Sequence, residues 1–168
     1  QIMVATLTPE TDCVYFAYFE PYSHERHLDL IGSAAASEHV QVRRLGATLD
    51  GRDMTLLRIT DEQAVALVPQ RRKVWLIARQ HPGETMAQWF IEGLLERLLD
   101  VDDPVAKVLL AKCVFYVVPN MNPDGAVRGN LRTNVAGANL NREWQAPSMD
   151  RSPAVFLVRP ARQAVGVD

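Results

Sequence analysis

Two residues that can bind a metal ion lie three positions apart in the stretch RQHPGE, at His81 and Glu84. In a first helical turn, this spacing brings the imidazole and the carboxylate to one side. Both are ligands that zinc accepts, and a catalytic zinc takes three protein ligands and leaves one position open for water. The H-x-x-E spacing alone also fits an ordinary helix start without a metal, so both interpretations stay open at this point.

The segments around this pair predict the elements that position it. An apolar run at 74–78 predicts a buried strand, and an amphipathic run of period 3.6 predicts a helix from Pro82 to Leu99. A second apolar run at 113–118 predicts another strand. A strand–helix–strand unit makes its two strands parallel, so their carboxyl ends meet at one edge of the sheet. We therefore expect His81 to lie beside the segment that begins at Asn120.

Residues 119–147 form a long polar segment with three motifs: NPDG at 122–125, GNLR at 129–132 and GANLNR at 137–142. Long loops in compact domains are usually functional or disordered. Together with HPGE at 81–84, this ordered set resembles the zinc carboxypeptidases of the M14 class. It is closest to the cytosolic carboxypeptidase branch and its bacterial relatives. The segment FEPYS at 19–23 resembles the start of the catalytic domain in that branch.

The resemblance implies a role for each matching residue. His81 and Glu84 would bind one Zn²⁺ ion, and Arg132 would donate hydrogen bonds to the oxyanion of the reaction. Asn141 and Arg142 would hold the terminal carboxylate of the substrate. The residue types agree with this chemistry. A developing oxyanion needs a positive donor, and the planar guanidinium of arginine binds a carboxylate through two parallel hydrogen bonds.

Other polar residues of the chain receive a structural interpretation. The NPDG motif is turn chemistry, and we do not expect Asp124 to bind the metal. Arg128 is interpreted as a solvated loop charge. It could add positive potential near Asn141 and Arg142, the residues expected to clamp the substrate carboxylate. His24 and His27 share a helix face but match no motif, so a surface or capping role is favoured for both.

The function implied is that of a zinc-dependent metallocarboxypeptidase, a hydrolase that removes C-terminal residues from peptides or proteins. One alternative is an M14-like amidohydrolase or deacylase of small acyl amino acids, which shares the H-x-x-E motif and the Asn-Arg pair. A second alternative is a metal-free module that only binds carboxylates. The length of the Asn-rich segment favours the peptidase. The intact pair of His81 and Glu84 argues against the metal-free module.

The chain departs from the family pattern at both ends. In the family, the third zinc ligand is a histidine that follows the helix begun here by Ser152, and the general base and a covering tyrosine come later. No histidine follows His81, so the third ligand is expected beyond Asp168. Residues 1–19 are interpreted as the last strands of a preceding β-sandwich domain, and residues 20–168 as the N-terminal half of the catalytic domain. We expect this piece to be inactive alone.

The remaining patterns complete the expected fold. Asp50-Gly51 between alternating runs at 40–45 and 54–59 predicts a β-hairpin. Ser23 is expected to cap a helix that Gly32 closes, and Ser152 begins a helix in which Pro160 predicts a kink or an early end. The fold class expected is α/β, with a mixed, largely parallel sheet and helices on both faces.

Composition narrows the function classes. The chain has 168 residues, is 48% hydrophobic, and carries a net charge of −2, which favours neither nucleic acid nor an anionic membrane as a partner. Cys13 and Cys113 are interpreted as buried free thiols, and no signal peptide is visible in the sequence. The expected location is the cytoplasm, and the expected partner is a peptide or protein C-terminus.

Overall fold

A four-stranded mixed sheet organises the fold, with the strand order β1-β2-β4-β3. The computed structural model describes residues 4, 6–17, 19–66 and 70–166. Its elements are α1 (His24–Ala35), β1 (Val40–Ala47), β2 (Asp53–Ile59), the 3₁₀ helix η1 (Gln63–Ala66), β3 (Arg72–Ile77), α2 (Met86–Leu98), α3 (Pro104–Lys112), β4 (Cys113–Val118), α4 (Pro123–Arg128), the 3₁₀ helix η2 (Leu140–Arg142) and α5 (Pro153–Ala164).

The strand pairings confirm a mixed sheet but correct the expected proportion of parallel to antiparallel pairs. The predicted hairpin forms between β1 and β2, with Gly51 in the left-handed region at φ 81°. β2 pairs with β4 antiparallel, and β3 pairs with β4 parallel. Within the described residues, antiparallel pairings therefore predominate, because the hairpin adds its second strand to β4 in the reverse direction.

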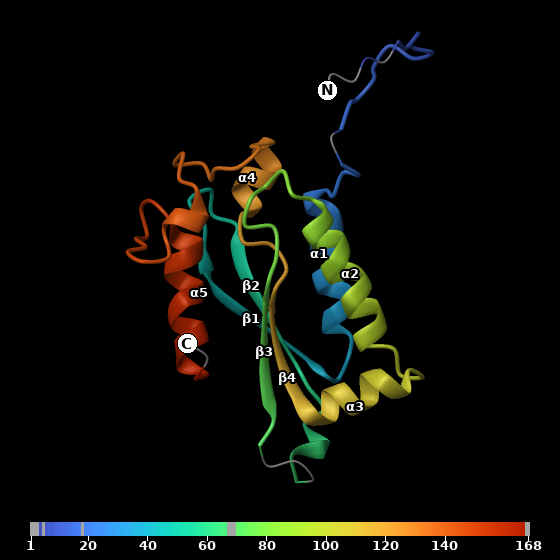
Figure 1. The fold of residues 1–168 in the computed structure, drawn as a ribbon, viewed down its shortest axis with the longest axis vertical. Helices are drawn as coiled ribbons and strands as arrows, with labels where there is room; N and C mark the ends of the chain where they lie inside the picture. Colours follow the sequence, from blue (N-terminus) through green and yellow to red (C-terminus); the bar gives the residue numbers. More distant parts are fainter. Residues whose placement is uncertain (1–3, 5, 18, 67–69, 167–168) are drawn as a thin grey trace.

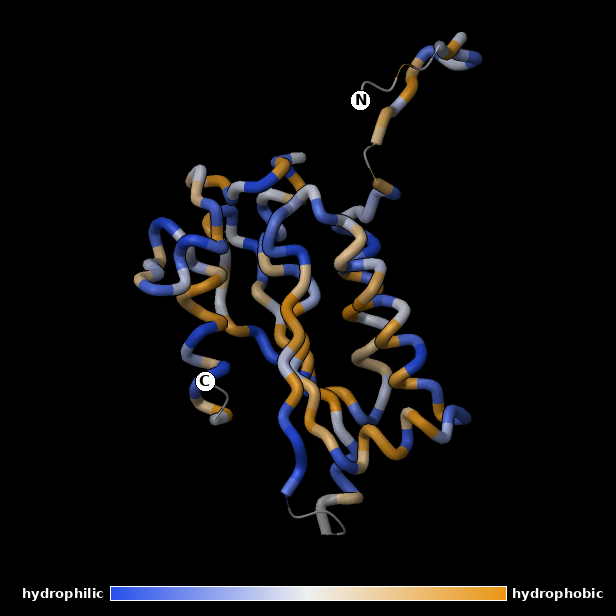
Figure 2. The backbone as a smooth tube through the Cα atoms, viewed as in Figure 1, coloured by the Kyte–Doolittle hydropathy of each residue, from blue (hydrophilic) through white to orange (hydrophobic). Residues whose placement is uncertain are grey.

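Helices cover both faces of the sheet, as predicted (Figure 1). Side chains alternate along a strand, so Phe115 and Val117 of β4 face one layer while Tyr116 and Val118 face the other. The first layer contains α1, α2 and α3, and the second contains α5. Figure 2 shows that the apolar colouring concentrates in the strands between these layers. Burial of both faces explains why 113–118 reads as a continuous apolar run.

The chain segments that follow β3 and β4 lie side by side. The backbone N–H of Ala78 donates to Val118 O at 3.0 Å, and the N–H of Met121 donates to Ala78 O at 2.9 Å. The side-chain amide of Asn122 also donates to Gln80 O at 3.4 Å. The predicted common edge is therefore present, and it brings the ligand turn, defined as residues 81–84, against the polar segment at 119–147.

Several predicted boundaries are corrected. The ligand turn is a non-helical turn in which Glu84 N–H donates to His81 O at 3.1 Å, so α2 begins at Met86 and Pro82 is not its first residue. Ser23 caps α1 as predicted, but the helix passes Gly32 and ends at Ala35. Packing decides this end, because Ala34 is buried in the core.

Two predictions for the C-terminal part are also corrected. Helix α5 does not end early at Pro160 but continues to Ala164, and fully buried Val155 and Val158 supply packing that offsets the missing hydrogen bond. The polar segment at 119–147 contains α4 and η2 rather than turns alone.

The N-terminal segment extends away from the body of the fold (Figure 1). Its described residues, 4, 6–17 and 19, contain none of the strands predicted there, and the remaining positions lie outside the described residues. Cys13 is exposed rather than buried, whereas Cys113 is buried, and both are free thiols. The assignment of residues 1–19 to a preceding domain stays a prediction. In the described ranges, no helix has the length and apolar content needed to cross a membrane.

Candidate active site

The ligand turn brings His81 and Glu84 into contact. Nδ1 of His81 lies 3.0 Å from Oε1 of Glu84. His81 is 7% exposed, whereas the side chain of Glu84 is 47% exposed. The imidazole is thus held within the protein while the carboxylate reaches the surface. The two predicted metal ligands point toward one another.

The other ring nitrogen of His81 contacts a residue from the distant GANLNR motif. Nε2 lies 3.1 Å from Oδ1 of Asn139. That same Oδ1 accepts the backbone N–H of Asn141 at 3.1 Å, which fixes the amide orientation because a backbone N–H can only donate. Nε2 must therefore carry the proton of the His81–Asn139 hydrogen bond. In the neutral ring, Nδ1 then presents a lone pair to Glu84.

This arrangement fits a cation. A lone pair facing a carboxylate is unfavourable unless a proton or a metal ion lies between the two atoms. Two ligand bonds of roughly 2.0–2.2 Å in tetrahedral geometry place the ligand atoms roughly 3.4 Å apart, close to the observed 3.0 Å between His81 and Glu84. Among the described residues, His, Cys, Asp and Glu form no group of three or more that could hold a metal. The two predicted ligands, His81 and Glu84, thus lie close enough to share one metal ion.

A backbone contact positions Arg132 beside this pair. The N–H of Gly83 donates to Leu131 O at 3.0 Å, which fastens the ligand turn to the GNLR motif. A Cβ on Gly83 would lie 2.9 Å from that carbonyl oxygen, so the close approach requires glycine. Nη1 of Arg132 lies 3.9 Å from Oε1 of Glu84, and its side chain is 56% exposed. The predicted oxyanion donor thus borders the predicted metal ligands.

Helix α4 also packs against the ligand turn. Asn122 caps α4 by accepting the N–H of Gly125 at 3.1 Å, and Pro123 occupies the first turn. A Cβ on Gly125 would lie 2.5 Å from Cγ of Pro82 and 2.8 Å from Thr133 O. The NPDG motif, predicted as turn chemistry, is therefore the capped start of a short helix whose glycine lets it approach the ligand turn.

Asn141 and Arg142 lie in η2, and both are exposed. The N–H of Arg142 donates to Asn139 O at 2.9 Å, so the predicted carboxylate clamp is attached to the residue that contacts His81. In the part of the chain that the structure describes, the side chain of Arg142 has neither a hydrogen bond nor an ion pair. Its guanidinium is thus available to a carboxylate from outside the chain.

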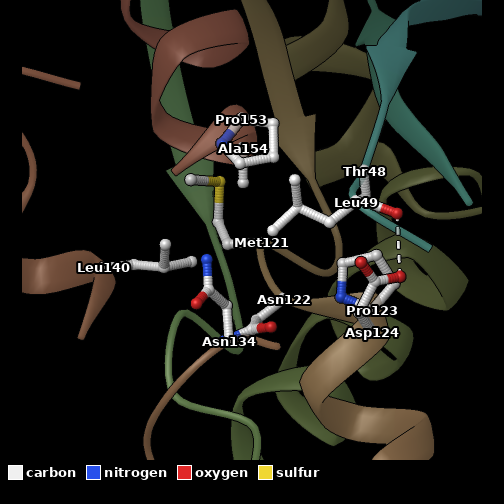
Figure 3. A pocket seen from close by; sticks show the side chains of 10 residues that line it. All are labelled: Thr48, Leu49, Met121, Asn122, Pro123, Asp124, Asn134, Leu140, Pro153 and Ala154. Atoms are coloured by element: carbon white, nitrogen blue, oxygen red, sulfur yellow. Dashed lines mark hydrogen bonds between the residues drawn. The ribbon is translucent and has the colours of Figure 1, made fainter. Parts of the chain in front are cut away.

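Asp124 and Arg128 have structural partners. Oδ1 of Asp124 accepts from Thr48 Oγ1 at 2.8 Å (Figure 3). It also accepts from Arg52 Nη1 at 2.9 Å, so the hairpin loop is tied to α4. This agrees with the expectation that Asp124 is not a metal ligand. Arg128 donates to Asp50 at 2.6 and 2.9 Å. Arg128 is a solvated charge as predicted, but it lies at the end of α4 rather than in a loop and is paired with Asp50.

The pocket in Figure 3 is separate from the candidate residues. It has a volume of about 10 Å³, enough for about one water molecule. Thr48, Leu49, Met121, Asn122, Pro123, Asp124, Asn134, Leu140, Pro153 and Ala154 line it. None of the five predicted site residues is among them, so this pocket belongs to the packing beneath α4 and η2.

One of the two histidines of α1 differs from expectation. His27 is buried, and its Nδ1 lies 3.2 Å from Nε2 of Gln88. Burial, aided by nearby His24 and Arg79, lowers the pKa of His27 to about 4. The predicted surface role is therefore wrong for His27, which is a neutral core residue.

Asn139 is a residue of the candidate site that sequence reasoning missed. It lies inside the quoted GANLNR motif, but no role was assigned to it. Its contact with His81 spans 58 residues of sequence, and only the meeting of two loops creates it. A histidine that binds a metal through one ring nitrogen usually donates a hydrogen bond from the other. This rule could have prompted a search for a partner of His81.

Comparisons with known proteins identify relatives of this chain. The sequence profile of the family described as zinc carboxypeptidase, Peptidase_M14, matches residues 28–155. An uncharacterized protein of Zymomonas mobilis is 53% identical over 161 residues, which are 96% of this chain and 40% of that protein. Human cytosolic carboxypeptidase 1 is 37% identical over 156 residues, which are 86% of this chain and 13% of that protein.

A solved structure has the same fold over the shared region. The metallo-carboxypeptidase from Pseudomonas aeruginosa, in complex with (2-guanidinoethylmercapto)succinic acid, superposes with a TM-score of 0.80 at 50% identity. The match covers 89% of this chain and 39% of that chain. The chain thus spans about two fifths of the length of these bacterial relatives.

Proposed function

Because the chain belongs to the zinc carboxypeptidase family, we propose that the protein containing it is a zinc-dependent metallocarboxypeptidase that removes C-terminal residues from peptides or proteins. The observation that carries the proposal is the 3.0 Å contact between His81 Nδ1 and Glu84 Oε1, with Nε2 of the same ring bonded to Asn139. This contact orients two zinc-binding groups toward one point.

His81 and Glu84 would hold the zinc ion. When bound, zinc supplies a Lewis acid for the scissile carbonyl and lowers the pKa of a bound water. The third ligand and the general base are expected beyond Asp168, so the proposal concerns the full-length protein. This chain alone is expected to be inactive.

The residues of this chain perform two further tasks in the proposal. Arg132 donates hydrogen bonds to the carbonyl oxygen as negative charge develops on it. Asn141 and Arg142 hold the terminal carboxylate, and the unpaired, exposed guanidinium of Arg142 supports this role. The Pseudomonas aeruginosa relative in complex with a succinic acid derivative also supports it, since that compound carries carboxyl groups.

The proposed partner is the free C-terminus of a peptide or protein, and the proposed location is the cytoplasm. The similarity to cytosolic carboxypeptidase 1 supports this location. The pairing of Arg128 with Asp50 removes it as a source of unpaired positive charge near the clamp.

The experiment compares three substrates with the zinc-loaded full-length protein: an N-blocked peptide with a free C-terminus, the same peptide amidated, and an N-acetyl amino acid. We expect zinc-dependent release of the last residue from the free peptide and little cleavage of the amidated one. Equal cleavage of both peptides would contradict an exopeptidase. Cleavage of the acetyl amino acid alone would favour the deacylase, and binding without cleavage would favour the carboxylate-binding module.

A further inference from the structure

Arg79, two residues before His81, has an unusual backbone conformation. Its φ is 48°, and it is the one non-glycine residue with positive φ in the described ranges. The left-handed region favours glycine, because a Cβ crowds the neighbouring carbonyl there. Such a residue persists where its surroundings hold it in place, and these positions concentrate at functional sites.

The side chain of Arg79 is buried and donates a hydrogen bond to the ligand turn. The residue is 6% exposed, and its Nε donates to Pro82 O at 2.7 Å. Nη1 donates to Tyr22 O at 2.9 Å and to Oε1 of Gln88 in α2. All three acceptors are neutral oxygens. The guanidinium is therefore held by hydrogen bonds to these oxygens and not by an ion pair with a carboxylate.

The contacts of Gln88 extend this network. Its Oε1 accepts from Arg79, so its amide nitrogen is the group that faces Nδ1 of His27 in α1. Through one guanidinium, the ligand turn is therefore connected to α2, to α1 and to the segment before α1. Tyr22 and Gln88, at 4% and 0% exposed, are anchors buried in the fold.

We propose that Arg79 is a positioning residue that sets the separation of His81 and Glu84 by holding the carbonyl of Pro82 between them. The proposal rests on the proposed zinc site. Pro82 O lies in the middle of the ligand turn, so a shift of that peptide changes the direction in which both flanking side chains point. A forked guanidinium can hold Pro82 O and Tyr22 O at once, whereas a lysine ammonium is a single point of donation.

The test uses the full-length protein with Arg79→Met, which keeps the volume and removes the donors, and Arg79→Lys, which keeps the charge. Arg71→Met is the matched control. Arg71 also donates to backbone and side-chain oxygens, at Asp61 and Thr60, but it precedes β3 at the far end of that strand from the ligand turn. Three quantities are measured: zinc affinity by competition with a chromophoric chelator, the visible absorption spectrum of the Co²⁺-substituted protein, and Tm.

For Arg79→Met we expect zinc affinity to fall by about 10–100-fold, the loss typical for supports of metal ligands, together with a changed Co²⁺ spectrum. Arg79→Lys should recover Tm but not zinc affinity. Arg71→Met should lower Tm and leave zinc affinity and the spectrum as in the wild type.

Three results would overturn the proposal. One is wild-type affinity and spectrum in Arg79→Met with only Tm reduced, which would make the residue a stability element. Another is an equal loss of zinc in Arg79→Met and Arg71→Met, and the third is full recovery of affinity in Arg79→Lys. A wild-type protein that binds no zinc would instead reject the proposed function itself, so the two failures are distinguishable.

Discussion

His81 Nε2 donates to Asn139 Oδ1 at 3.1 Å, across 58 residues of sequence, and this hydrogen bond decides which ring nitrogen is free for a metal. The backbone N–H of Asn141 donates to the same oxygen, so the amide cannot reverse without losing a partner. The histidine is thereby held in the tautomer that offers Nδ1 to the side of Glu84. This relationship makes Asn139 as testable as the ligands themselves.

Asn139→Ala in the full-length protein should lower zinc affinity by about 10–100-fold, because the His81 ring loses the acceptor that fixes its tautomer. Asn139→Asp keeps an acceptor and adds negative charge, so its affinity should match or exceed that of the wild type. Competition with a chromophoric chelator measures both. Unchanged affinity in Asn139→Ala would mean that packing alone orients the ring.

Glu84→Ala and Arg132→Ala should separate metal binding from catalysis. Glu84→Ala removes a ligand and should abolish zinc retention after dialysis, as measured by elemental analysis. Arg132→Ala should retain zinc and lower kcat by about 10²–10³-fold, because an oxyanion donor acts mainly on the transition state. Equal zinc loss in both variants would show that Arg132, 3.9 Å from Glu84, supports the metal site instead.

Arg142→Ala should lower kcat/KM for peptides with a free C-terminus by about 10²–10³-fold, since the substrate carboxylate loses its charged partner. The variant should barely distinguish free from amidated peptides. Arg128→Ala is the control, because Arg128 is an exposed arginine already paired with Asp50. If Arg142→Ala still prefers the free peptide as strongly as the wild type, another residue holds the carboxylate.

Gly125→Ala should distort the candidate metal site although it alters neither His81 nor Glu84. The added Cβ would lie 2.5 Å from Pro82 Cγ, so either α4 or the ligand turn must move. We expect a lower Tm and a weaker zinc affinity. Gly93→Ala in α2 is the control, because nothing lies within 4 Å of its Cβ position and alanine should stabilise the helix by about 0.5–1 kcal/mol. Wild-type zinc affinity in Gly125→Ala would show that the contact is not needed for ligand geometry.

His27 should make stability depend on pH. Burial lowers its pKa from 6.5 to about 4, so between these values the unfolded chain binds more protons than the folded one. Stability is therefore full above about pH 6.5 and is lost as the pH falls toward 4, by up to about 3 kcal/mol. Urea unfolding at pH 7, 5.5 and 4.5 measures the slope. His27→Gln should flatten it, and an unchanged slope would assign the effect to other groups.

The amino-acid sequence by itself determined the local elements and the choice of candidate site residues. The Asp50-Gly51 hairpin, the strand at 113–118 and the cap at Ser23 follow from turn chemistry, a continuous apolar run and capping, which act over a few residues. The spacing of His81 and Glu84 likewise predicted their contact, since three residues of one turn suffice to bring them together.

Only the tertiary structure decided how separate segments meet. Asn139 reaches His81 because η2 and the ligand turn pack at one sheet edge, and the buried contacts of Arg79 join three such segments. The start of α2 at Met86 was also missed, because the residues before it form a turn that packs against Leu131 and α4. Periodicity and propensity describe neighbours along the chain, whereas these contacts depend on where distant backbone groups find their hydrogen-bond partners.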